Sequence, residues 1–397
     1  MASKLKKLVL FGAGKIGRSF IGQLFGRSGY EVVFIDIDQR VIDALNQKHS
    51  YRVFICDTDP ETIVVENVRG VQGRDVEEVA GEIVSADILA VSVGKNRLKH
   101  IVPSLSRGLV EREKVFPGRA IDIILAENMR NADLFLHDEL TDVLPESYPL
   151  DQRVGFVETS IGKMVPFAVN RQDNDILSVW AEAYNTLIVN KEAFKNPIPI
   201  ITGMEAKENM KAWVDRKLFI HNFGHAAAAY LGYEHHPELN FLWEVLEDEK
   251  IRAFVREAMQ QSATALQYEY PDVFSTKHLQ EHINDLIQRF SNRILGDTVF
   301  RVGCDLHRKL SFDDRIITPL MSAYKNGLPY NMILKVLASA LHFKATGIDG
   351  SMYPADMEFQ ERLKECGTLY VFEKICGFTA SEATQFLNQI NETNEYE

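Results

Sequence analysis

The sequence lacks the features that define several large classes of protein. It has only four cysteines in 397 residues, Cys56, Cys304, Cys366 and Cys376, and they form neither a CxxC pair nor the spacing of a metal site. This usage argues against a disulfide scaffold and predicts reduced thiols and no metal ion. No apolar run reaches the roughly 18 residues that a transmembrane helix needs, so a membrane-spanning protein is not expected.

An excess of positive charge is also missing. The chain has 44 lysine and arginine residues against 56 aspartate and glutamate residues, which gives a formal net charge of −12. A groove that binds nucleic acid requires a basic face, so no nucleic-acid partner is expected. The charge is still compatible with a small anionic ligand, provided that a few basic side chains converge on it.

The chain start does not have the pattern of a secretory signal. Its apolar run is short, is interrupted by glycine and then by Lys15 and Arg18, and has no cleavage site. We therefore expect a cytoplasmic protein. The second half shows no long apolar stripe that demands a partner, so a monomer is the default expectation.

The first half alternates between strand and helix patterns. Short apolar runs predict buried strands, and a helix pattern covers about Lys15 to Arg27. The predicted strands are residues 6–11, 31–36, 87–94 and 120–128. This alternation predicts an α/β domain of the Rossmann type, with a doubly wound, mainly parallel sheet. Residues 51–71 either add strands to this sheet or form a peripheral hairpin, and periodicity leaves both open.

The pattern changes after about residue 195. Pro197 and Pro199 mark a connector, and the segments beyond it have helical spacing with few β-branched runs. A chain of this length and a hydrophobic content of 46% can bury more than one core. We therefore predict a dinucleotide-binding domain over residues 1–195 and a mostly α-helical substrate domain over residues 196–397.

A glycine-rich loop follows the first predicted strand. Gly12, Gly14 and Gly17 form GxGxxG at the start of a helix, where they permit a tight turn, close approach of a pyrophosphate, and helix–strand packing. The helix N-terminus then offers backbone N–H groups to the phosphates. The expected cofactor contacts in this loop are Gly12, Ala13, Gly14, Lys15, Ile16 and Gly17. Asp36 ends the second strand, where a carboxylate binds ribose hydroxyl groups and repels a 2′-phosphate, so NAD is favoured over NADP.

Two later strand ends are expected to open onto the same crevice. Ligands in such sheets bind beyond the carboxyl ends of the strands. The residues there are Ser92, Val93 and Gly94 in one case and Glu127 and Asn128 in the other. Asn128 either binds the nicotinamide ribose or the substrate, or it caps the next helix.

The stretch KLFIHNFGH (217–225) places polar groups in an apolar helical pattern. On an α-helix, Lys217, Asn222 and His225 share one side, whereas His221 points elsewhere. Oxidation of a secondary alcohol needs a base and hydrogen-bond donors for the developing oxyanion, and these side chains can supply both. The alternative reading is a buried helix whose polar groups are satisfied internally.

The motif Lys217-x4-Asn222-x2-His225 resembles the KxxxxNxxH signature of the polyol-specific long-chain dehydrogenases. The likeness is greatest to members that act on D-mannitol 1-phosphate and extends in order along nearly the whole chain. The matching segments are FGAGKIGRSFIG (11–22), ILAENM (124–129), GFVETSIGKMVP (155–166), DRKLFIHNFGHAAAAYLG (215–232), DEKIRA (248–253), RKLSFDDRIITPL (308–320) and YKNGLP (324–329). The chain departs from the family pattern at Gly162-Lys163 and at Thr186-Leu187.

The resemblance implies NAD-dependent interconversion of D-mannitol 1-phosphate and D-fructose 6-phosphate. It implies Lys217 as the general base, Asn222 and His225 as oxyanion donors, and assistance from Asn128. Arg308, Lys309 and Arg315 lie in a matching segment, and at least one of them is expected to bind the substrate phosphate.

Several other functions remain open on the sequence. A reductase of fructuronate or tagaturonate is the nearest alternative, because the same basic residues suit a carboxylate. A decarboxylating dehydrogenase of the 6-phosphogluconate type is disfavoured by the spacing of Lys217 from His221-Asn222. The pair Tyr370-x3-Lys374 mimics a short-chain dehydrogenase but lies far from the cofactor loop. A catalytically inactive NAD-binding sensor is disfavoured by the intact motif.

Overall fold

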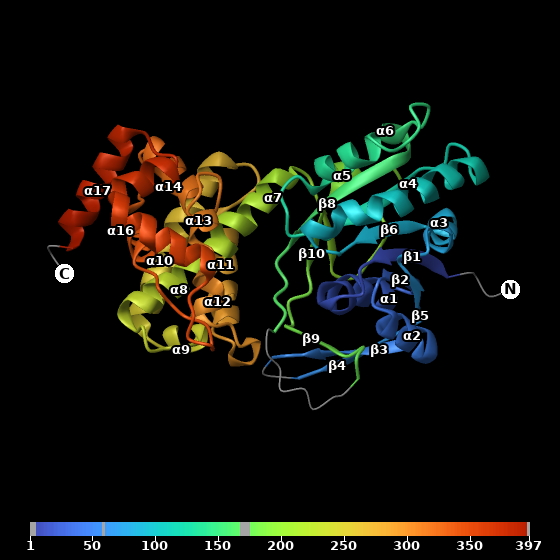
Figure 1. Cartoon of the computed structure of the whole chain (residues 1–397), viewed down its shortest axis with the longest axis horizontal. Helices are drawn as coiled ribbons and strands as arrows, with labels where there is room; N and C mark the ends of the chain where they lie inside the picture. The colour runs from blue at the N-terminus through green and yellow to red at the C-terminus, as the bar shows by residue number, and fades with distance from the viewer. Residues whose placement is uncertain (1–4, 58–59, 167–174, 395–397) are drawn as a thin grey trace. The chain divides into compact units, whose positions relative to one another are not determined.

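The structure is a computed structural model that describes residues 5–57, 60–166 and 175–394. The chain divides into two compact units, with the division between Val214 and Asp215 (Figure 1). The first unit combines strands and helices, and the second is helical.

An eight-stranded sheet forms the centre of the first unit. Its strand order is β11-β10-β8-β7-β6-β1-β2-β5, and every neighbouring pair is parallel except β8 with β10. The strands are β1 (Lys6–Phe11), β2 (Tyr30–Asp36), β5 (Val68–Gln72), β6 (Ile88–Val91), β7 (Ile121–Leu125), β8 (Val154–Ile161), β10 (Leu187–Asn190) and β11 (Met204–Lys207). The predicted fold class, a doubly wound and mainly parallel sheet followed by a helical domain, is confirmed.

A second, three-stranded sheet has the order β4-β3-β9. It consists of β3 (Ser50–Ile55), β4 (Thr62–Glu66) and β9 (Val179–Ala181), with β3 antiparallel to β4 and parallel to β9. The stretch whose role was open from the sequence therefore does both things. Its first part forms a peripheral hairpin, and its last part, β5, is the edge strand of the main sheet.

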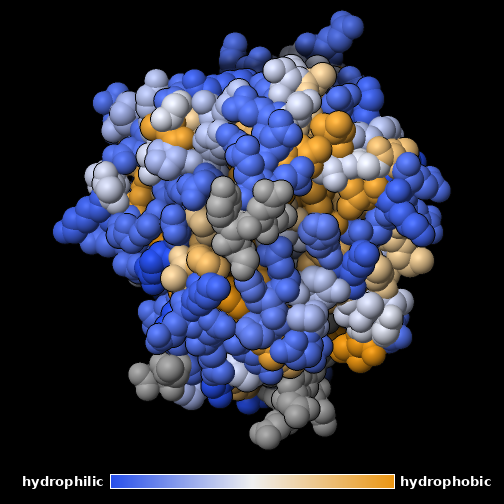
Figure 2. All heavy atoms as spheres, turned by 90° about the vertical axis from the view of Figure 1, so that its left-hand side faces the viewer, coloured by the Kyte–Doolittle hydropathy of each residue, from blue (hydrophilic) through white to orange (hydrophobic). Residues whose placement is uncertain are grey.

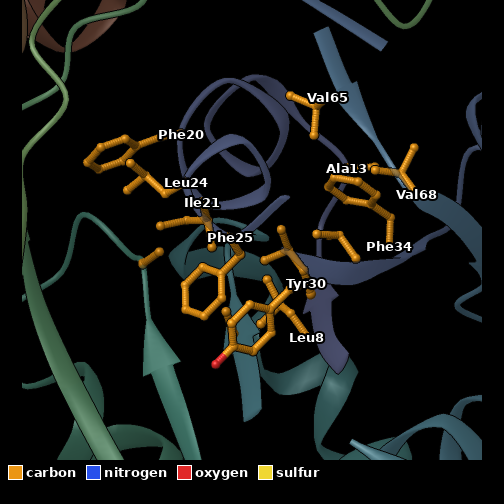
Figure 3. Packing of buried hydrophobic residues seen from close by; sticks show 14 of the residues in the cluster. Leu8, Ala13, Phe20, Ile21, Leu24, Phe25, Tyr30, Phe34, Val65 and Val68 are labelled. Carbon is orange, nitrogen blue, oxygen red and sulfur yellow. The ribbon is translucent and has the colours of Figure 1, made fainter. Parts of the chain in front are cut away.

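Helices cover both faces of the main sheet. Successive residues of β1 belong to two different clusters: Leu8 and Leu10 to one, Val9 and Phe11 to the other. Figure 3 shows part of the first cluster, in which the rings of Phe25 and Tyr30 meet edge to face at 5.1 Å. Burial on both faces explains why these strands are continuous apolar runs without alternation.

The helices of the first unit follow the strands in the order expected for a doubly wound sheet. They are η1 (Gly17–Gly22), α1 (Gln23–Arg27), α2 (Gln39–Lys48), α3 (Val76–Ser85), η2 (Lys95–Arg97), α4 (Leu98–Val115), α5 (Ala132–Thr141), α6 (Leu150–Arg153), η3 (Lys191–Ala193) and α7 (Met210–Arg216). The helix predicted from Lys15 to Arg27 is thus a π-turn, η1, that continues into the short α1.

The second unit is built around α8 (Phe223–His235), whose residues Ala226 to Leu231 are fully buried. The hydroxyl group of Tyr230 on α8 donates to the carbonyl oxygen of Gly303 at 2.9 Å. The other helices are η4 (Lys217–Asn222), α9 (Leu242–Val245), α10 (Glu249–Glu269), α11 (Thr276–Phe290), η5 (Arg293–Leu295), α12 (Val299–Gly303), α13 (Leu306–Lys309), α14 (Ile317–Lys325), α15 (Asn331–Leu341), α16 (Pro354–Lys374) and α17 (Ala380–Asn394).

The division between the units lies later than the expected boundary at residue 195. The reason is β11, which follows the proline-containing connector and pairs with β10 in parallel register. The connector therefore leads back to the sheet of the first unit before the helical unit begins.

The surface agrees with the acidic, polar composition. The face in Figure 2 is mostly hydrophilic, with hydrophobic side chains in scattered patches. Within the part of the chain that the structure describes, no helix combines the length and the hydropathy needed to cross a membrane.

Candidate active site

The glycine-rich loop after β1 has three glycines with three different surroundings. Gly12 has φ +98°, and a Cβ atom there would overlap the carbonyl oxygen of Ser92. A Cβ atom at Gly17 would overlap the carbonyl oxygen of Gly12. The start of η1 can therefore pack this closely against the end of β1 only with glycine at position 17. At Gly14, by contrast, nothing lies within 4 Å of the Cβ position. The open space at Gly14 fits the close approach of a pyrophosphate, which is the role predicted for it.

The carboxylate of Asp36 holds this loop from the end of β2. Oδ2 accepts a hydrogen bond from the backbone N–H of Ala13 at 2.7 Å, and Oδ1 accepts from the N–H of Asp38 at 3.0 Å. Asp36, Gly12 and Gly14 line one pocket of about 680 Å³. Asp38 instead caps the N-terminus of α2 and pairs with Arg40.

The same pocket has lining residues that sequence reasoning missed. Ile37 and Val76 are large apolar side chains with exposed fractions of 55% and 36%, so they offer apolar surface to a ligand in this pocket. Arg74, Arg97 and His100 add polar groups to the lining. Among these residues, the sequence could have indicated only Ile37, an apolar residue directly after Asp36. The other four lie in the loop after β5, at the start of α3, in η2 and in α4.

Glu127 and the 92–94 loop are brought together, but in a different way from the prediction. The buried carboxylate of Glu127 accepts from the N–H groups of Val93 at 2.7 Å and of Gly94 at 2.9 Å. Burial raises its pKa, and the two N–H groups oppose that rise. Ser92 and Val93 line the pocket. Glu127 instead holds the 92–94 loop by accepting hydrogen bonds from its backbone. Lys15 is exposed and donates to the carbonyl oxygen of Pro166 at 3.2 Å, Ile16 is half-buried, and Asn128 is exposed just beyond β7.

Lys163, at one of the departures from the family pattern, has a positioning role within the first unit. Its buried ammonium group donates to the carbonyl oxygens of Glu182 at 3.0 Å and Tyr184 at 2.8 Å, and to Oδ1 of Asn185 at 3.0 Å. Leu187, at the other departure, begins β10 and is fully buried. The ammonium group of Lys163 therefore binds residues of the segment directly before the second departure, Thr186-Leu187.

The motif helix of the second unit contains a π-turn. Residues Lys217 to Asn222 form η4, between α7 and α8. Bonding from i to i+5 winds the chain more loosely than an α-helix, so the directions of Lys217 and Asn222 are closer together than the α-helical angles used for the prediction. Ser262 on α10 donates to the carbonyl oxygen of Phe219 at 2.5 Å, and Arg315 to that of Asn222 at 3.4 Å. Side chains from two other segments of the second unit thus donate hydrogen bonds to carbonyl oxygens of η4.

Lys217 has the electrostatic surroundings of a general base. Burial and the nearby charge of Arg315 lower the pKa of its amine from 10.5 to about 8. Desolvation penalises the ammonium form, and a second cation penalises it further. A sizeable fraction of Lys217 is therefore a neutral amine near neutral pH, which an ordinary surface lysine is not.

The two histidines of the motif are both inside the unit. His221 is 5% exposed, and the half-buried His225 stacks on Phe290 with ring centroids 4.7 Å apart and planes at 10°. Burial lowers the pKa of both histidines well below the usual value, and neighbouring cations reinforce the effect. Both rings are therefore neutral at physiological pH. The ring of His225 adjoins that of His221 at 6.4 Å.

The three basic residues predicted to bind phosphate have different environments. Arg315 is largely buried, pairs through Nε with Asp314 at 2.8 Å, and contacts η4. Arg308 is half-exposed and pairs with Asp305 at 2.5 Å and with Asp314 at 3.3 Å. Lys309 is buried, and its ammonium group donates to the carbonyl oxygens of Val302 and Cys304 at the end of α12. Burial lowers its pKa to about 7. Arg315 is thus the basic residue that contacts the motif helix, and Lys309 is bound to backbone.

No group of three histidine, cysteine, aspartate or glutamate side chains suited to a metal ion occurs among residues 5–57, 60–166 and 175–394.

Comparison with known proteins agrees with this architecture. Residues 6–203 match the family model of the mannitol dehydrogenase Rossmann domain, and residues 209–367 match that of the mannitol dehydrogenase C-terminal domain. Among solved structures, the chain is similar to mannitol 2-dehydrogenase of Pseudomonas fluorescens in a ternary complex with NAD and D-mannitol. The identity is 16% and the TM-score 0.75, over 98% of this chain and 91% of that one.

A D-sorbitol dehydrogenase in substrate-free form is also similar in fold, with 14% identity and a TM-score of 0.79 over 97% of this chain and 94% of that one. Both family models match in order, and together they cover both structural units from the glycine-rich loop to α16. The chain belongs to the mannitol dehydrogenase family.

Proposed function

We propose that the chain is an NAD-dependent polyol dehydrogenase that interconverts D-mannitol 1-phosphate and D-fructose 6-phosphate, the activity of a mannitol-1-phosphate 5-dehydrogenase. The first unit is the dinucleotide-binding domain, and the second is the substrate domain. The observation that carries the proposal is the lowered pKa of Lys217, about 8, in a helix that also presents Asn222 and His225.

The cofactor assignment rests on the pocket of the first unit. The space at Gly14 accommodates a pyrophosphate, and the carboxylate of Asp36 lies where ribose hydroxyl groups bind. A 2′-phosphate beside this carboxylate is disfavoured by like charge. These features support NAD, the dinucleotide in the complex of the P. fluorescens relative.

Lys217 moves the proton in the proposed reaction. Its neutral amine accepts the proton of the substrate's secondary hydroxyl group and becomes an ammonium ion, while the amide of Asn222 donates a hydrogen bond to the oxygen as negative charge develops. Bound NAD supplies the hydride acceptor. In the direction of ketose reduction, the Lys217 ammonium ion returns the proton to the oxygen.

Arg315 supports a phosphorylated substrate. Its guanidinium group is largely buried, contacts the carbonyl oxygen of Asn222, and is the cation that lowers the pKa of Lys217. A guanidinium group suits phosphate because it can donate two parallel hydrogen bonds. Arg308 shares the carboxylate of Asp314 with Arg315, so the two side chains form one charged group.

The test is loss of NADH absorbance with purified protein and one of four substrates: fructose 6-phosphate, fructose, fructuronate or tagaturonate. We expect turnover with fructose 6-phosphate and little with fructose. Turnover with a hexuronate in place of fructose 6-phosphate would retain the cofactor and base assignments and overturn the substrate. No turnover with any ketose, combined with tight NADH binding, would favour an NAD-binding sensor.

A further inference from the structure

A buried carboxylate lies against the histidine of the motif. Oδ2 of Asp297 is 3.0 Å from Nε2 of His225, and the side chain of Asp297 is 7% exposed. Asp297 is outside the motif by more than 70 residues, and nothing in the sequence pattern had marked it.

The backbone around Asp297 is fixed on both sides. Its carbonyl oxygen accepts from the N–H of Leu242 at 2.9 Å, and the N–H of Val299 donates to the carbonyl oxygen of Asn240 at 2.9 Å. Thr298 caps α12 by accepting from the N–H of Arg301. The guanidinium group of Arg301 in turn contacts Oδ1 of Asp297. Asp297 is therefore held in place from its backbone and from its second oxygen.

The carboxylate decides which nitrogen of His225 carries the proton. A neutral imidazole has one N–H and one bare lone pair, and a lone pair turned toward a carboxylate at 3.0 Å is repelled. The proton is therefore favoured on Nε2. In the described part of the chain no acceptor is aligned with Nε2 for a hydrogen bond, so the preference arises from charge and proximity.

The ring of His225 packs against two other rings. It stacks on Phe290 at 4.7 Å, and His221 adjoins it at 6.4 Å. Burial, together with Arg301, Lys309 and Arg315, lowers the pKa of His225, so the neutral ring is the form to be explained. With Nε2 protonated, a neutral His225 has Nδ1 as its acceptor.

We propose that Asp297 is a positioning residue that keeps the proton of His225 on Nε2, so that Nδ1 accepts a hydrogen bond from a substrate hydroxyl group. This assignment rests on the proposed function for the role of the substrate. It also revises the expectation that His225 donates to the oxyanion, and leaves that donation to Asn222.

The direct test is nitrogen NMR of protein labelled with ¹⁵N-histidine, in the absence of substrate. The His225 signals are assigned by their loss in His225→Gln. We expect Nε2 to show the shift of a protonated nitrogen and Nδ1 that of a bare one. A neutral ring protonated on Nδ1 would overturn the proposal. The spectrum requires no turnover, so failure of the proposed activity and failure of this assignment are separate results.

A charge-neutral variant gives a second test. In Asp297→Asn the amide can present either its oxygen or its NH2 group to Nε2, so we expect a mixture of tautomers and a turnover number lower by roughly 10- to 100-fold, the range typical of residues that orient a histidine. An unchanged tautomer and turnover in a folded Asp297→Asn protein would contradict the proposal. If that variant does not fold, the wild-type spectrum still shows which nitrogen of His225 carries the proton.

The matched control is Asp248→Asn. Asp248 also faces a histidine, with Oδ2 at 3.1 Å from Nε2 of His236, but this pair is half-exposed, and Asp248 caps α10. Asparagine caps helices as well as aspartate does, so the fold is retained. We expect the signals of His225 and the turnover number to be unchanged in this variant.

Discussion

At the scale of single residues, Lys217 is the side chain on which the chemistry depends, since it combines burial with a neighbouring cation. We expect Lys217→Ala to lower the turnover number by at least about 100-fold, the contribution of a general base, while NADH binding is retained. Steady-state rates and NADH fluorescence titration measure the two quantities. Turnover near that of the wild type would remove Lys217 from its assigned role.

The pKa of Lys217 also predicts the pH dependence. Alcohol oxidation needs the neutral amine, so its kcat/KM should rise with pH and level off above about 8. Ketose reduction needs the ammonium form, so its kcat/KM should fall as pH rises through the same value. An unperturbed lysine would place both transitions near 10.4. Arg315→Gln should move both transitions upward, because it removes the second cation.

Asp36 is the residue at which cofactor choice is expected to be set. Asp36→Ala removes the carboxylate that repels a 2′-phosphate, so the ratio of kcat/KM for NAD to that for NADP should fall by at least about tenfold. The same change removes the acceptor for the N–H of Ala13, so some loss of affinity for NAD is expected as well. An unchanged ratio would mean that another residue of the pocket contacts the ribose.

At the scale of elements, the π-turn η4 changes the directions in which the motif residues point. In an α-helix Lys217 and Asn222 share one side, and bonding from i to i+5 brings their directions closer together. Ser262 and Arg315 bind carbonyl oxygens of the turn. The sequence pattern predicted the helix and its polar residues, but not the turn, because η4 depends on partners on α10 and in the 308–320 segment.

The glycine-rich loop permits a comparison of two glycines with equal space around them. Nothing lies within 4 Å of a Cβ atom at Gly14 or at Gly81, which lies within α3. Gly14→Ala should leave the melting temperature nearly unchanged and raise the dissociation constant for NADH at least about tenfold, a loss of about 1.4 kcal/mol. Gly81→Ala should stabilise the fold by up to about 1 kcal/mol and leave NADH affinity unchanged.

Calorimetry and NADH titration of the two variants provide the measurements. Equal NADH affinity in Gly14→Ala and the wild type would show that the pyrophosphate does not use the space at Gly14.

Glu127 and Lys309 illustrate what an element-level pattern cannot distinguish. Glu127 was predicted from its position at a strand end and Lys309 from its position in a matching segment. Both are bound to backbone groups: Glu127 to the 93–94 N–H groups and Lys309 to the carbonyl oxygens at the end of α12. A charged side chain that organises a loop and one that contacts a ligand look alike in a sequence. Arg74 and His100 were missed for the opposite reason, because only the folded sheet brings their segments to the pocket.

At the scale of the whole molecule, the fold class was predictable because it depends on periodicity summed over many residues. The runs Leu8–Phe11 of β1 and Ile88–Val91 of β6 are buried on both faces, and this burial appears directly in the sequence as uninterrupted apolar residues. The return of β11 to the sheet was not predictable, since its residues are half-buried or exposed and form only a four-residue strand. Asp297 was not predictable either, because its contact with His225 depends on the packing of α12 against α8.

The division into two units predicts that NADH and fructose 6-phosphate slow hydrogen exchange in different segments of the chain. NADH should slow exchange of backbone amides in residues 12–17 and 92–97, which form the pocket of the first unit. Fructose 6-phosphate added with NAD, a pair that cannot react because both are oxidised, should additionally slow exchange in residues 217–225 and 308–315. Fructose with NAD is the matched control, since it lacks the phosphate for Arg315. Mass spectrometry of peptic fragments measures each segment. If fructose 6-phosphate protected only the first unit, the second unit would lose its assignment as the substrate domain, whatever the rate of the reaction.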